Sequence, residues 1–386
     1  MIYLDACATA PLRPGVLQRM IETQDQAWAN PSSLHGFGLK ASEALERARS
    51  EIASNLDADH RDVVFTSGAT ESIHLALHGL AASRPQGRIV ISSVEHPAVS
   101  GAARLLAMSG WEVTEWPVDE LGRIRLELLE QLLAPPTQIV SLVWGQGEVG
   151  TIQPLLAVAE ACRTKGIPIH TDATQVLSQG LPSWKHLPVD FLTASAHKCG
   201  GPRGIGLLMT RESHRSGLKP LLSGGGQEGG LRSGTESVVL AIGMAAALDQ
   251  IKCCPPADLA RSGQGIADLR DALRDRLLRD ERLIVCGDPE DRLPHHLSLL
   301  VSDHNGQPVS GRQLVRSLDA CGLAVSSGSA CSSGKDSDSP VLAAMGLPSM
   351  MRRSSIRISL GPWIEREHLD GIVRRFHQGL EQALCS

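Results

Sequence analysis

Four reactive or polar side chains follow short apolar runs that are typical of buried strands. They are Thr70, His96, Asp172 and Lys198, which come after the runs 62–66, 88–92, 167–171 and 189–195. Because ligands of open parallel sheets bind at the carboxyl ends of the strands, we expect these side chains to line one site. Lys198 also precedes a glycine-rich tract in HKCGGPRGIG, a setting in which an amine can be partly desolvated and its pKa lowered for Schiff-base chemistry.

The turn SGATES at 67–72 leads from the first of these runs into a helical pattern. Its N–H groups and hydroxyls, helped by the helix dipole, could hold a phosphate group. The same residues are also typical of a helix cap that binds no ligand. The turn alone leaves both interpretations open.

Two further residues are candidates for contact with a substrate. Cys331 lies in AVSSGSACSSGKDSDSP (324–340), whose composition is too polar for a protein core, and a thiol in such surroundings is typical of a nucleophile. Arg357 stands in the strand pattern SSIRISLG, where its guanidinium could bind a substrate carboxylate through two N–H groups. An arginine at the protein surface is the alternative interpretation.

Helical periodicity separates most of the apolar runs, and this alternation predicts an α/β fold with a mainly parallel sheet flanked by helices. The predicted strands are 62–66, 88–92, 138–143, 167–171, 189–195 and 205–209, and the helices predicted among them are 70–83, 97–110 and 155–166. After CCPPAD (253–258), a long polar helix over 257–280 and shorter alternating segments predict a second, smaller α+β domain.

The composition excludes several classes of function. The 386 residues are 42% hydrophobic and carry 37 Lys and Arg against 42 Asp and Glu, a net charge of -5. This charge and an aromatic content of 3% argue against a nucleic-acid binder. No apolar run reaches the roughly 18 residues of a membrane helix, and the first residues lack a signal-peptide pattern, so we expect a cytoplasmic protein.

Neither the cysteines nor the longest glycine tract predicts a metal or dinucleotide site. Nine cysteines without a C-x-x-C pair indicate no disulfide framework and no metal cage. The tract GGGQEG (224–229) matches G-x-G-x-x-G, but no strand leads closely into it and no helix begins directly from it. The dinucleotide interpretation is therefore rejected.

Nine motifs that occur in order over nearly the whole chain resemble those of NifS/IscS-type cysteine desulfurases, pyridoxal-phosphate enzymes of the class V aminotransferase family. They are YLDACATAP, NPSSLHGFG, FTSGATES, EHPAV, HTDATQ, SAHKCGGPRGIG, GGGQEGGLRSGTE, SSGSACSSG and SSIRISLG. The resemblance implies the pyridoxal-phosphate-dependent transferase fold type I. A large cofactor-binding α/β domain would span 15–256, and a small α+β domain of 1–14 and 257–386 would carry the loop with Cys331.

The resemblance also implies a role for each matching residue around pyridoxal 5′-phosphate. Lys198 would hold the cofactor as a Schiff base, Asp172 would pair with its pyridine nitrogen, and Gln175 would bind its phenolic oxygen. His96 would stack on the ring and move protons. The residues expected around the cofactor's phosphate are Ala69, Thr70, Ser195, His197 and, from the partner subunit, Thr235.

Cys331 matches the nucleophile of the family. It would attack the sulfur of the substrate L-cysteine, so that L-alanine leaves and a persulfide remains on Cys331. Asn30 and Arg357 match positions near the substrate carboxylate. Because the family's active site lies at a subunit interface, a homodimer is implied. The length of the segment around Cys331 resembles the branch that supplies Fe–S cluster assembly, which implies a sulfur-acceptor or Fe–S scaffold protein as a partner.

The chain departs from the family pattern in WGQGEVG (144–150), where Gln146 and Gly147 replace a pair of asparagines. In the family the second asparagine donates to the cofactor's phenolic oxygen, so Gly147 would remove a hydrogen bond worth about 0.5–1.5 kcal/mol. We therefore hypothesise altered cofactor electronics or a weakened bond to Lys198. Smaller departures are Ala10, in place of a threonine, and the short tail LEQALCS, which puts the docking of a standard scaffold partner in question.

Two other functions are compatible with the sequence. One is a pyridoxal-phosphate-dependent lyase for selenocysteine, cysteine sulfinate or cystine, in which Cys331 is dispensable. The other is a cofactor-poor homologue that acts as a low-activity scaffold subunit, against which the retention of the lysine, the aspartate and the cysteine named above argues. Alanine formation by a Cys331→Ala variant distinguishes the lyase from the desulfurase.

Overall fold

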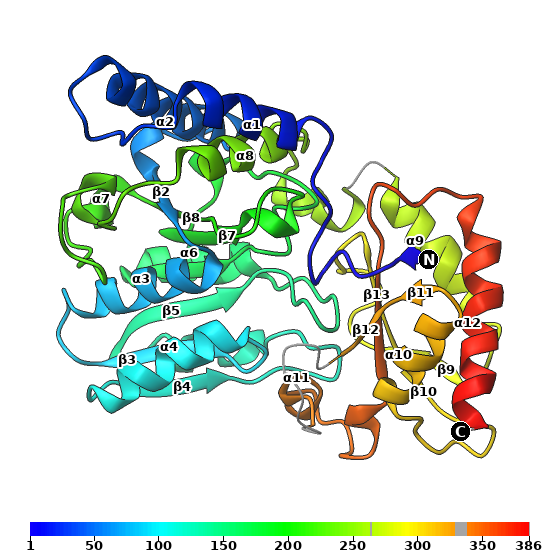
Figure 1. Cartoon of the computed structure of the whole chain (residues 1–386). Helices are drawn as coiled ribbons and strands as arrows, with labels where there is room; N and C mark the ends of the chain where they lie inside the picture. Colours follow the sequence, from blue (N-terminus) through cyan, green and yellow to red (C-terminus); the bar gives the residue numbers. More distant parts are fainter. Residues whose placement is uncertain (263–264, 329–337, 386) are drawn as a thin grey trace.

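Seven strands form the central sheet of the larger part of the molecule, drawn from blue to green in Figure 1. The structure is a computed structural model, and it describes residues 1–262, 265–328 and 338–385. In order across the sheet, the strands are β2 (Val63–Thr66), β8 (Gly206–Thr210), β7 (Phe191–Ser195), β6 (Ile169–Asp172), β5 (Thr137–Val143), β3 (Arg88–Ser92) and β4 (Glu112–Trp116). β8 runs antiparallel to both of its neighbours, and the other pairings of this sheet are parallel. The mainly parallel sheet predicted from the sequence is confirmed.

All six strands predicted for this region are present, and the sequence analysis missed the seventh, β4. This strand lies at the edge of the sheet and pairs with β3 alone. Its residues Glu112 and Glu115 are exposed, and Trp116 is its buried residue. Glu112 and Glu115 lie on opposite faces of the strand, so this edge strand is partly solvated on both faces. It therefore does not form the continuous apolar run that revealed the other strands.

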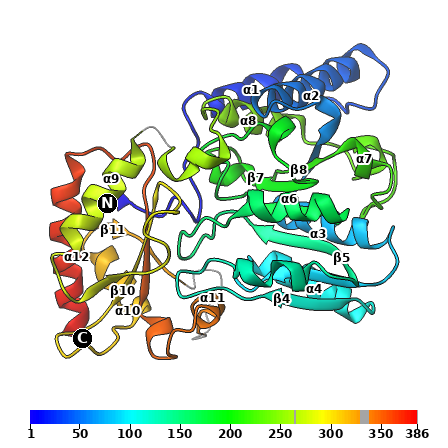
Figure 2. The same cartoon turned by 180° about the vertical axis from the view of Figure 1, so that it is seen from behind.

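Alternate residues of the strands pack against helices on opposite faces of the sheet, which Figures 1 and 2 show from the two sides. The helices of this part are α1 (Val16–Gln26), α2 (Gly36–Asn55), α3 (Ala69–Ala81), α4 (Pro97–Met108), α5 (Leu129–Leu132), α6 (Leu155–Lys165), α7 (Glu212–Arg215) and α8 (Val238–Leu248). Val64 and Ile89 pack in one core with α3 and α4. Their neighbours Val63 and Val90 pack in another core with α2, α6 and α8. Strands buried on both faces in this way explain the unbroken apolar runs of the sequence.

An antiparallel four-stranded sheet supports the smaller part of the molecule, drawn from yellow to red in Figure 1. In order, its strands are β12 (Ser326–Ser327), β13 (Ser355–Ser359), β10 (His296–Val301) and β9 (Leu283–Val285). Its helices are α9 (Ile266–Leu277), α10 (Gly311–Ala320), α11 (Pro340–Ala344) and α12 (His368–Leu384). The sheet and three of these helices share a core that includes Leu273, Leu299, Leu314 and Phe376, so this part is an α+β structure with a core of its own.

The long polar helix predicted over 257–280 is wrong in its extent. Pro256–Arg261 form a 3-10 helix, and α9 begins only at Ile266. Gly265 precedes α9 with a φ of 87°, a left-handed conformation through which an α-helix cannot continue. No helix within the described residues is both long and apolar enough to cross a membrane.

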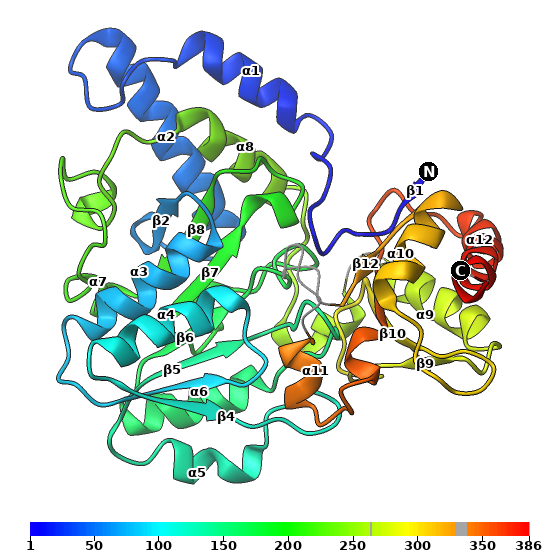
Figure 3. The ribbon, with the colours of Figure 1, turned by 60° about the horizontal axis from the view of Figure 1, so that its bottom comes forward.

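Residues 4–13, which we call the N-terminal strap, connect the two parts of the molecule, as the blue chain in Figure 3 shows. Before it, β1 (Ile2–Tyr3) pairs with β11 (Leu323–Ala324) in the smaller part. At the other end of the strap, the N–H of Ala10 donates to the carbonyl of His197 at 2.9 Å and that of Arg13 to the carbonyl of Gly200 at 2.8 Å. The strap therefore runs directly beside the turn that carries Lys198.

Candidate active site

The carboxyl ends of four strands bring the predicted site residues to one edge of the large sheet. β2 and β7 both run antiparallel to β8, so β2 points in the same direction as the parallel strands β7, β6, β5 and β3. Thr70, His96 and Lys198 follow the ends of β2, β3 and β7, and Asp172 is the last residue of β6. The four residues therefore lie at the carboxyl edge of the sheet, where open parallel sheets bind their ligands.

Lys198 ends a short 3-10 turn (Ala196–Lys198) that directly follows β7, and its side chain is half-buried. Its Nζ donates to two carbonyl oxygens of the N-terminal strap, those of Cys7 at 2.5 Å and Ala8 at 2.7 Å. The Nε2 of Gln175 donates to the same Cys7 carbonyl at 3.1 Å. Two predicted cofactor ligands therefore converge on one backbone oxygen. The amine of Lys198 is thereby held in a defined position at the end of β7.

Asp172 is the last residue of β6 and is buried, and the backbone N–H of Thr174 donates to its Oδ1 at 2.9 Å. Two titratable groups near Asp172 are neutral at pH 7 because they are buried. Burial lowers the pKa of His170 to about 4, against the opposing charge of Asp172. Burial, with a smaller contribution from Asp172, raises the pKa of Glu95 to about 8. Asp172 is therefore not neutralised by the nearby histidine, and Glu95 remains protonated near pH 7.

Glu95 joins the ends of two strands, a role that the sequence analysis did not assign. Its Oε1 accepts from the Ser92 hydroxyl at 2.9 Å and from the Val143 N–H at 2.7 Å. These contacts fix the position of His96, the next residue. The signal in the sequence is an acidic residue directly after a buried strand, within the motif EHPAV.

The raised pKa of Glu95 predicts a specific pH dependence of stability. The folded state keeps this proton up to about pH 8, whereas the unfolded chain releases it near the ordinary value of 4.5. The stabilisation is complete below 4.5 and is lost as the pH rises through 8, with a slope of up to about 1.4 kcal/mol per pH unit. We expect Glu95→Gln to remove this slope. Urea unfolding of both holoproteins at several pH values between 5 and 8.5 measures it, and parallel curves would contradict the prediction.

The turn between β2 and α3, which we call the anion cradle, has a geometry that could bind an anion. The first N–H groups of a helix lack intrahelical partners, and no side chain within the described residues caps α3. A Cβ at Gly206 would lie 2.5 Å from Gly68 Cα, so β8 approaches the turn as closely as only a glycine allows. Ser195 Oγ lies 3.9 Å from the position that a Cβ at Gly68 would take. Ala69 and Thr70 at the helix start therefore share this cradle with Ser195.

The two predicted histidines differ in their surroundings. His96 is exposed and caps α4, because its Nδ1 accepts a hydrogen bond from the Ala98 N–H at 3.1 Å. In a neutral His96 ring, the proton is consequently on Nε2. His197 is half-buried, and its Nδ1 lies 3.2 Å from the Thr9 hydroxyl. Burial and the nearby charge of Lys198 lower the pKa of His197 to about 4, so it is a neutral hydrogen-bonding group at pH 7.

Arg357 lies in β13 and is buried, so the surface-arginine alternative is wrong. One terminal nitrogen donates to Asp5 Oδ1 at 2.8 Å, and the other donates to the Gly147 carbonyl at 3.0 Å. The second carboxylate oxygen of Asp5 accepts from the Ser326 hydroxyl at 2.7 Å. Asp5 therefore fixes the guanidinium plane and also holds the strand β12, and it is a second residue that the sequence analysis did not single out.

Three predicted residues do not join this group of contacts. Asn30 is exposed between α1 and α2, where its Oδ1 accepts from the Ser32 N–H at 2.9 Å. Thr235 is also exposed and makes no hydrogen bond within the part of the chain that the structure describes. Cys331 lies outside the described residues, which end at Gly328 on one side and resume at Asp338 on the other.

Cys7 is a third contributor that sequence reasoning missed, because a cysteine in an apolar segment is usually a small core residue. Its Sγ lies 3.1 Å from Nε2 of His295, and its N–H donates to the Ser359 hydroxyl at 2.9 Å. Burial raises the pKa of the Cys7 thiol, and burial lowers the pKa of His295 to about 3. Both groups are therefore neutral at pH 7. The contribution of Cys7 is its carbonyl, which no side-chain signal reveals.

The segment that departs from the family pattern is ordered by its own side chains. Gln146 Oε1 accepts from the N–H groups of Glu148 at 2.5 Å and Val149 at 2.9 Å, so it holds its own turn. A Cβ at Gly147 would lie 3.1 Å from Gln175 Nε2. The amide of Gln175 therefore occupies the space beside Gly147 into which a larger side chain would extend.

Introducing asparagine at this position tests the hypothesis about Gly147. In Gly147→Asn the Gln175 amide has to move by a few tenths of an ångström, which the end of a flexible side chain allows. A donor restored near the phenolic oxygen should lower the pKa of the bound cofactor by about 0.5–1 unit. A spectrophotometric pH titration of the holoprotein measures this shift. Gly371→Asn on α12, where a Cβ meets open space, is the control, and an unchanged titration in Gly147→Asn would refute the hypothesis.

Comparisons with known proteins agree with this geometry. The family described as aminotransferase class-V matches residues 2–372. A cysteine desulfurase IscS of Vibrio vulnificus is 38% identical over 386 residues, which cover 99% of this chain and 93% of that protein. The solved structure of a NifS-like protein, 32% identical, superposes with a TM-score of 0.87 over 99% of both chains. The structure of SspA in complex with cysteine, 30% identical, has a TM-score of 0.81 and covers 95% of this chain and 100% of that one.

Proposed function

Since the chain belongs to the aminotransferase class-V family and, within it, to the cysteine desulfurases of the NifS/IscS type, we propose that it takes the sulfur from L-cysteine and releases L-alanine with the help of pyridoxal 5′-phosphate. One observation of the structure carries the proposal. The Lys198 amine donates hydrogen bonds to two backbone carbonyls of the N-terminal strap. It does so at the sheet edge where Asp172 and the anion cradle also lie.

The described residues fit the cofactor. A half-buried amine, a buried carboxylate at a neighbouring strand end and an uncapped helix start are the groups that its aldehyde, ring nitrogen and phosphate require. When bound, the cofactor withdraws electrons from the substrate Cα and so weakens the bonds around it. Lys198 would hold it covalently, Asp172 would face its ring nitrogen, and Gln175 would face its phenolic oxygen.

Four residues of the same subunit would bind the phosphate group. Ala69 and Thr70 supply N–H groups and a hydroxyl at the start of α3, where the helix dipole favours negative charge. Ser195 supplies a hydroxyl from the end of β7. His197 supplies a neutral imidazole, because its pKa lies near 4. None of these four residues carries a positive charge, so the phosphate would be bound through hydrogen bonds and the helix dipole.

Protons are held at defined atoms of the site. The Asp172 carboxylate would hold a proton on the ring nitrogen, and the buried Glu95 and His170 beside it are neutral near pH 7. When Lys198 is free, the carbonyls of Cys7 and Ala8 would accept hydrogen bonds from its Nζ. His96 carries its proton on Nε2 and would exchange it above the ring.

Arg357 and Asn30 would orient the substrate. The guanidinium of Arg357 is fixed in its plane by Asp5 and by the Gly147 carbonyl, so its donors point in constant directions. A carboxylate is the natural ligand of such a group. Asn30, which is exposed, would complete the carboxylate site once the second subunit covers this region.

Cys331 would be the nucleophile. The described chain reaches its segment from β12, where Ser326 is directly opposite Arg357 in β13, so the segment starts beside the proposed carboxylate site. In the proposed step the Cys331 thiolate forms a bond to the substrate sulfur, and the C–S bond of the substrate breaks. The electron pair of that bond stays with the three-carbon fragment, which becomes L-alanine after protonation. The persulfide sulfur then passes to an acceptor such as an Fe–S scaffold protein.

A homodimer would complete the site. Thr235 is exposed and makes no hydrogen bond to the described residues of its own subunit, as expected for a group that serves a partner's phosphate site. Large apolar side chains are exposed around α1 and the start of α2, and a second copy would cover them. They are Leu17, Ile21, Trp28, Leu34 and Phe37.

We also infer the division into a large domain of 15–256 and a small domain of 1–14 and 257–386. The separate core of the smaller part supports it, since that core includes Leu4 together with residues from 266 onward. The helix α11 contributes Val341 and Leu342 to the core of the larger part, so the two domains pack closely. A cytoplasmic location remains a prediction from the sequence.

Product analysis with several substrates tests the proposed function. The cofactor-loaded dimer is incubated with L-cysteine, selenocysteine or cysteine sulfinate in the presence of reductant, or with cystine in its absence. L-alanine and, for cystine, pyruvate are quantified by mass spectrometry. We expect the highest kcat/KM for L-cysteine, with sulfide equal to alanine. Alanine or pyruvate from the other compounds, without alanine from L-cysteine, would indicate a lyase. A dimer that binds the cofactor and forms no alanine would indicate a scaffold subunit.

A further inference from the structure

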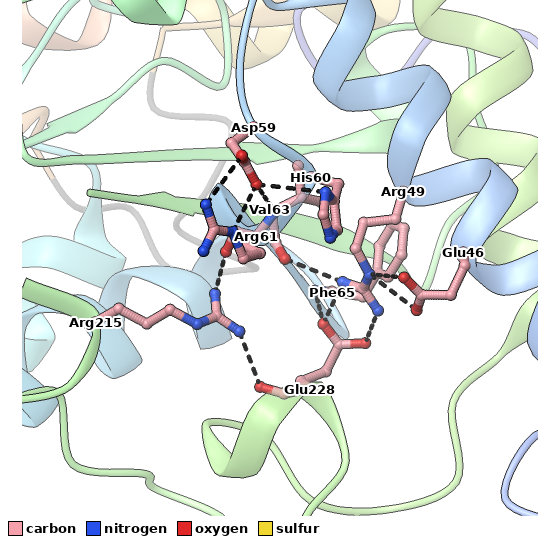
Figure 4. A network of polar contacts seen from close by, with 9 residues as sticks. All are labelled: Glu46, Arg49, Asp59, His60, Arg61, Val63, Phe65, Arg215 and Glu228. Atoms are coloured by element: carbon pink, nitrogen blue, oxygen red, sulfur yellow. Dashed lines mark hydrogen bonds and ion pairs between the residues drawn. The ribbon is translucent and has the colours of Figure 1, made fainter. Parts of the chain in front are cut away.

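An ion pair that the proposed reaction does not use is buried beside β2, and Figure 4 shows it with its surroundings. The two terminal nitrogens of Arg49 bind the two carboxylate oxygens of Glu228 at 2.7 and 2.8 Å. The side chains are 9% and 1% exposed. Two parallel N–H···O bonds give a guanidinium–carboxylate pair its most specific geometry, so the positions of the two residues are tightly defined.

Both partners of this pair are also attached to the backbone of β2. Arg49 donates to the Val63 carbonyl at 3.0 Å, and its guanidinium lies over the Phe65 ring, 4.8 Å from the ring centre. The N–H of Phe65 donates to Glu228 Oε2 at 2.9 Å. Burial lowers the pKa of Arg49, but the hydrogen bonds and charge of Glu228 outweigh this effect and raise it overall. The pair is therefore ionised and anchored to the sheet.

Glu228 belongs to the segment 222–236, which we call the glycine loop. The backbone of Glu228 has a φ of 52°, and those of the following Gly229 and Gly230 have φ values of 64° and 84°. A left-handed conformation is unfavourable for a residue with a side chain, so a specific contact has to hold Glu228 in it. The buried carboxylate provides this contact. The glycines that follow allow the chain to turn sharply away from the sheet.

Further contacts close the glycine loop and tie its far end to the same subunit. The Ser233 N–H donates to the Leu222 carbonyl, and the Gly234 N–H donates to Gln227 Oε1, both at 3.0 Å. Arg232 Nε lies 2.9 Å from Glu71 Oε1, in the first turn of α3. Thr235 comes directly after these contacts and is exposed. These contacts hold the glycine loop in a defined position and leave Thr235 exposed near its end.

We propose that the Arg49–Glu228 ion pair positions the glycine loop so that Thr235 reaches the phosphate of the cofactor bound to the partner subunit. This inference rests on the proposed function, because it requires the cofactor and the homodimer. A buried ion pair is weak evidence for stability as such, since its desolvation cost is high. Arg49 and Glu228 are positioning residues that act through Thr235. The ion pair of each subunit would thus support the phosphate site of the other subunit.

The same geometry offers a competing explanation, which the experiment has to exclude. β2, which the pair holds, leads directly into the turn 67–70 of its own subunit. Loss of the pair could therefore disturb the subunit's own phosphate cradle instead of the partner's. The two explanations predict that different subunits of a dimer are affected.

Mixed dimers separate the two explanations. Two differently tagged chains are co-expressed, and one of them carries Lys198→Ala, so that only the other can bind the cofactor covalently. Glu228→Gln is placed either in the Lys198→Ala chain or in the chain with the intact lysine. Each dimer is titrated with pyridoxal phosphate and treated with borohydride, which fixes the cofactor to Lys198. Mass spectrometry then gives the labelled fraction of the intact chain at each concentration.

We expect Glu228→Gln to weaken cofactor binding only in the subunit opposite the one that carries the substitution. With Glu228→Gln in the Lys198→Ala chain, the concentration for half-labelling should rise at least about tenfold, as for the loss of one hydrogen bond to a charged group. With Glu228→Gln in the chain that has the intact lysine, it should stay within about twofold of the dimer without this change. An equal defect in both arrangements, a defect only in the second, or no defect in either would overturn the inference.

Matched variants control the experiment. Glu46→Gln removes another carboxylate that contacts Arg49 at 3.1 and 3.2 Å but is not part of the glycine loop, and it should leave the half-labelling concentration unchanged. Thr235→Val in the Lys198→Ala chain should raise the half-labelling concentration as much as Glu228→Gln does. The two substitutions together should raise it no further than either one alone. If the Glu228→Gln chain does not fold, Arg49→Lys, which keeps the charge but not the two parallel bonds, replaces it.

The parent protein distinguishes a failure of this inference from a failure of the proposed function. Light scattering and the same borohydride labelling are applied to it first. A monomeric parent, or one that takes up no cofactor, would refute the proposed function and with it the inference. A dimeric, labelled parent in which the glycine loop variants show no defect across the interface would refute the inference alone.

Discussion

Lys198→Ala should abolish the covalent capture of pyridoxal phosphate and lower alanine formation from L-cysteine by about a thousandfold, within the range that positioned acid–base groups contribute. The variant loses the amine that lies on the Cys7 and Ala8 carbonyls, and the described chain places no second lysine in hydrogen-bond contact with these oxygens. Borohydride labelling followed by mass spectrometry measures the capture, and alanine quantification measures the rate.

A control separates this loss from a general disturbance of the fold. Lys198 makes two hydrogen bonds to the N-terminal strap, and each contributes about 0.5–1.5 kcal/mol. Lys185→Ala, at an exposed position, should leave both capture and rate unchanged. A small primary amine added to the Lys198→Ala protein should restore part of the rate. Covalent label on another lysine, or a rate within tenfold of the parent, would contradict the assignment.

The second large effect is expected at Arg357. Arg357→Ala leaves the Asp5 carboxylate, whose side chain is 16% exposed, without the guanidinium at 2.8 Å. Leaving a largely buried charge unpaired costs about 3–5 kcal/mol, so the free energy of unfolding should fall by this amount. The KM for L-cysteine should rise at least about tenfold as well, because a hydrogen bond to a charged carboxylate is lost. Urea unfolding and steady-state kinetics measure the two effects.

Asp5→Asn is the matched variant for this prediction. Asparagine keeps an oxygen that accepts from Arg357 and has almost the same volume, but it carries no charge. We expect a smaller loss of stability than in Arg357→Ala, together with a raised KM and a nearly unchanged kcat. If Arg357→Ala keeps the parent KM, the guanidinium does not bind the substrate, and its role is to hold Asp5 and Gly147 in place.

The strand-end positions of the site could be predicted because buried parallel strands leave a strong pattern. The strands that end at Asp172 and just before the turn of Lys198 are buried on both faces, because helices cover both sides of the sheet. The edge strand β4 left no such pattern, since each of its faces carries an exposed glutamate. The long helix after 256 was overestimated because helical periodicity continues across Gly265, whose backbone conformation the periodicity does not reveal.

The residues that sequence reasoning missed act through contacts that only the folded chain creates. Cys7 contributes a backbone carbonyl to Lys198, which lies 191 positions away in the sequence. Asp5 pairs with Arg357 across 352 positions. Glu95 acts through burial, which turns an ordinary acidic residue into a neutral link between two strands. Composition and spacing carry information about local structure, whereas these contacts join residues that lie far apart in the sequence.

At Gly147 the structure adds a neighbouring amide to the donor loss that was predicted from the sequence. The sequence indicated the loss of an asparagine donor. The structure places the Gln175 amide beside the position of the missing side chain, while Gln146 turns inward to hold its own loop. Whether the Gln175 amide replaces the lost donor is what the titration of Gly147→Asn measures.

The most direct test of the central claim is the release of alanine and sulfide from L-cysteine by the cofactor-loaded protein and its Cys331→Ala variant, with reductant present. Cys253→Ala, which removes an exposed cysteine, is the control. We predict equal amounts of alanine and sulfide from the parent and from Cys253→Ala, and no alanine above background from Cys331→Ala. Alanine formation at the parent rate in Cys331→Ala would show that the sulfur leaves without a protein persulfide, which contradicts the proposed reaction.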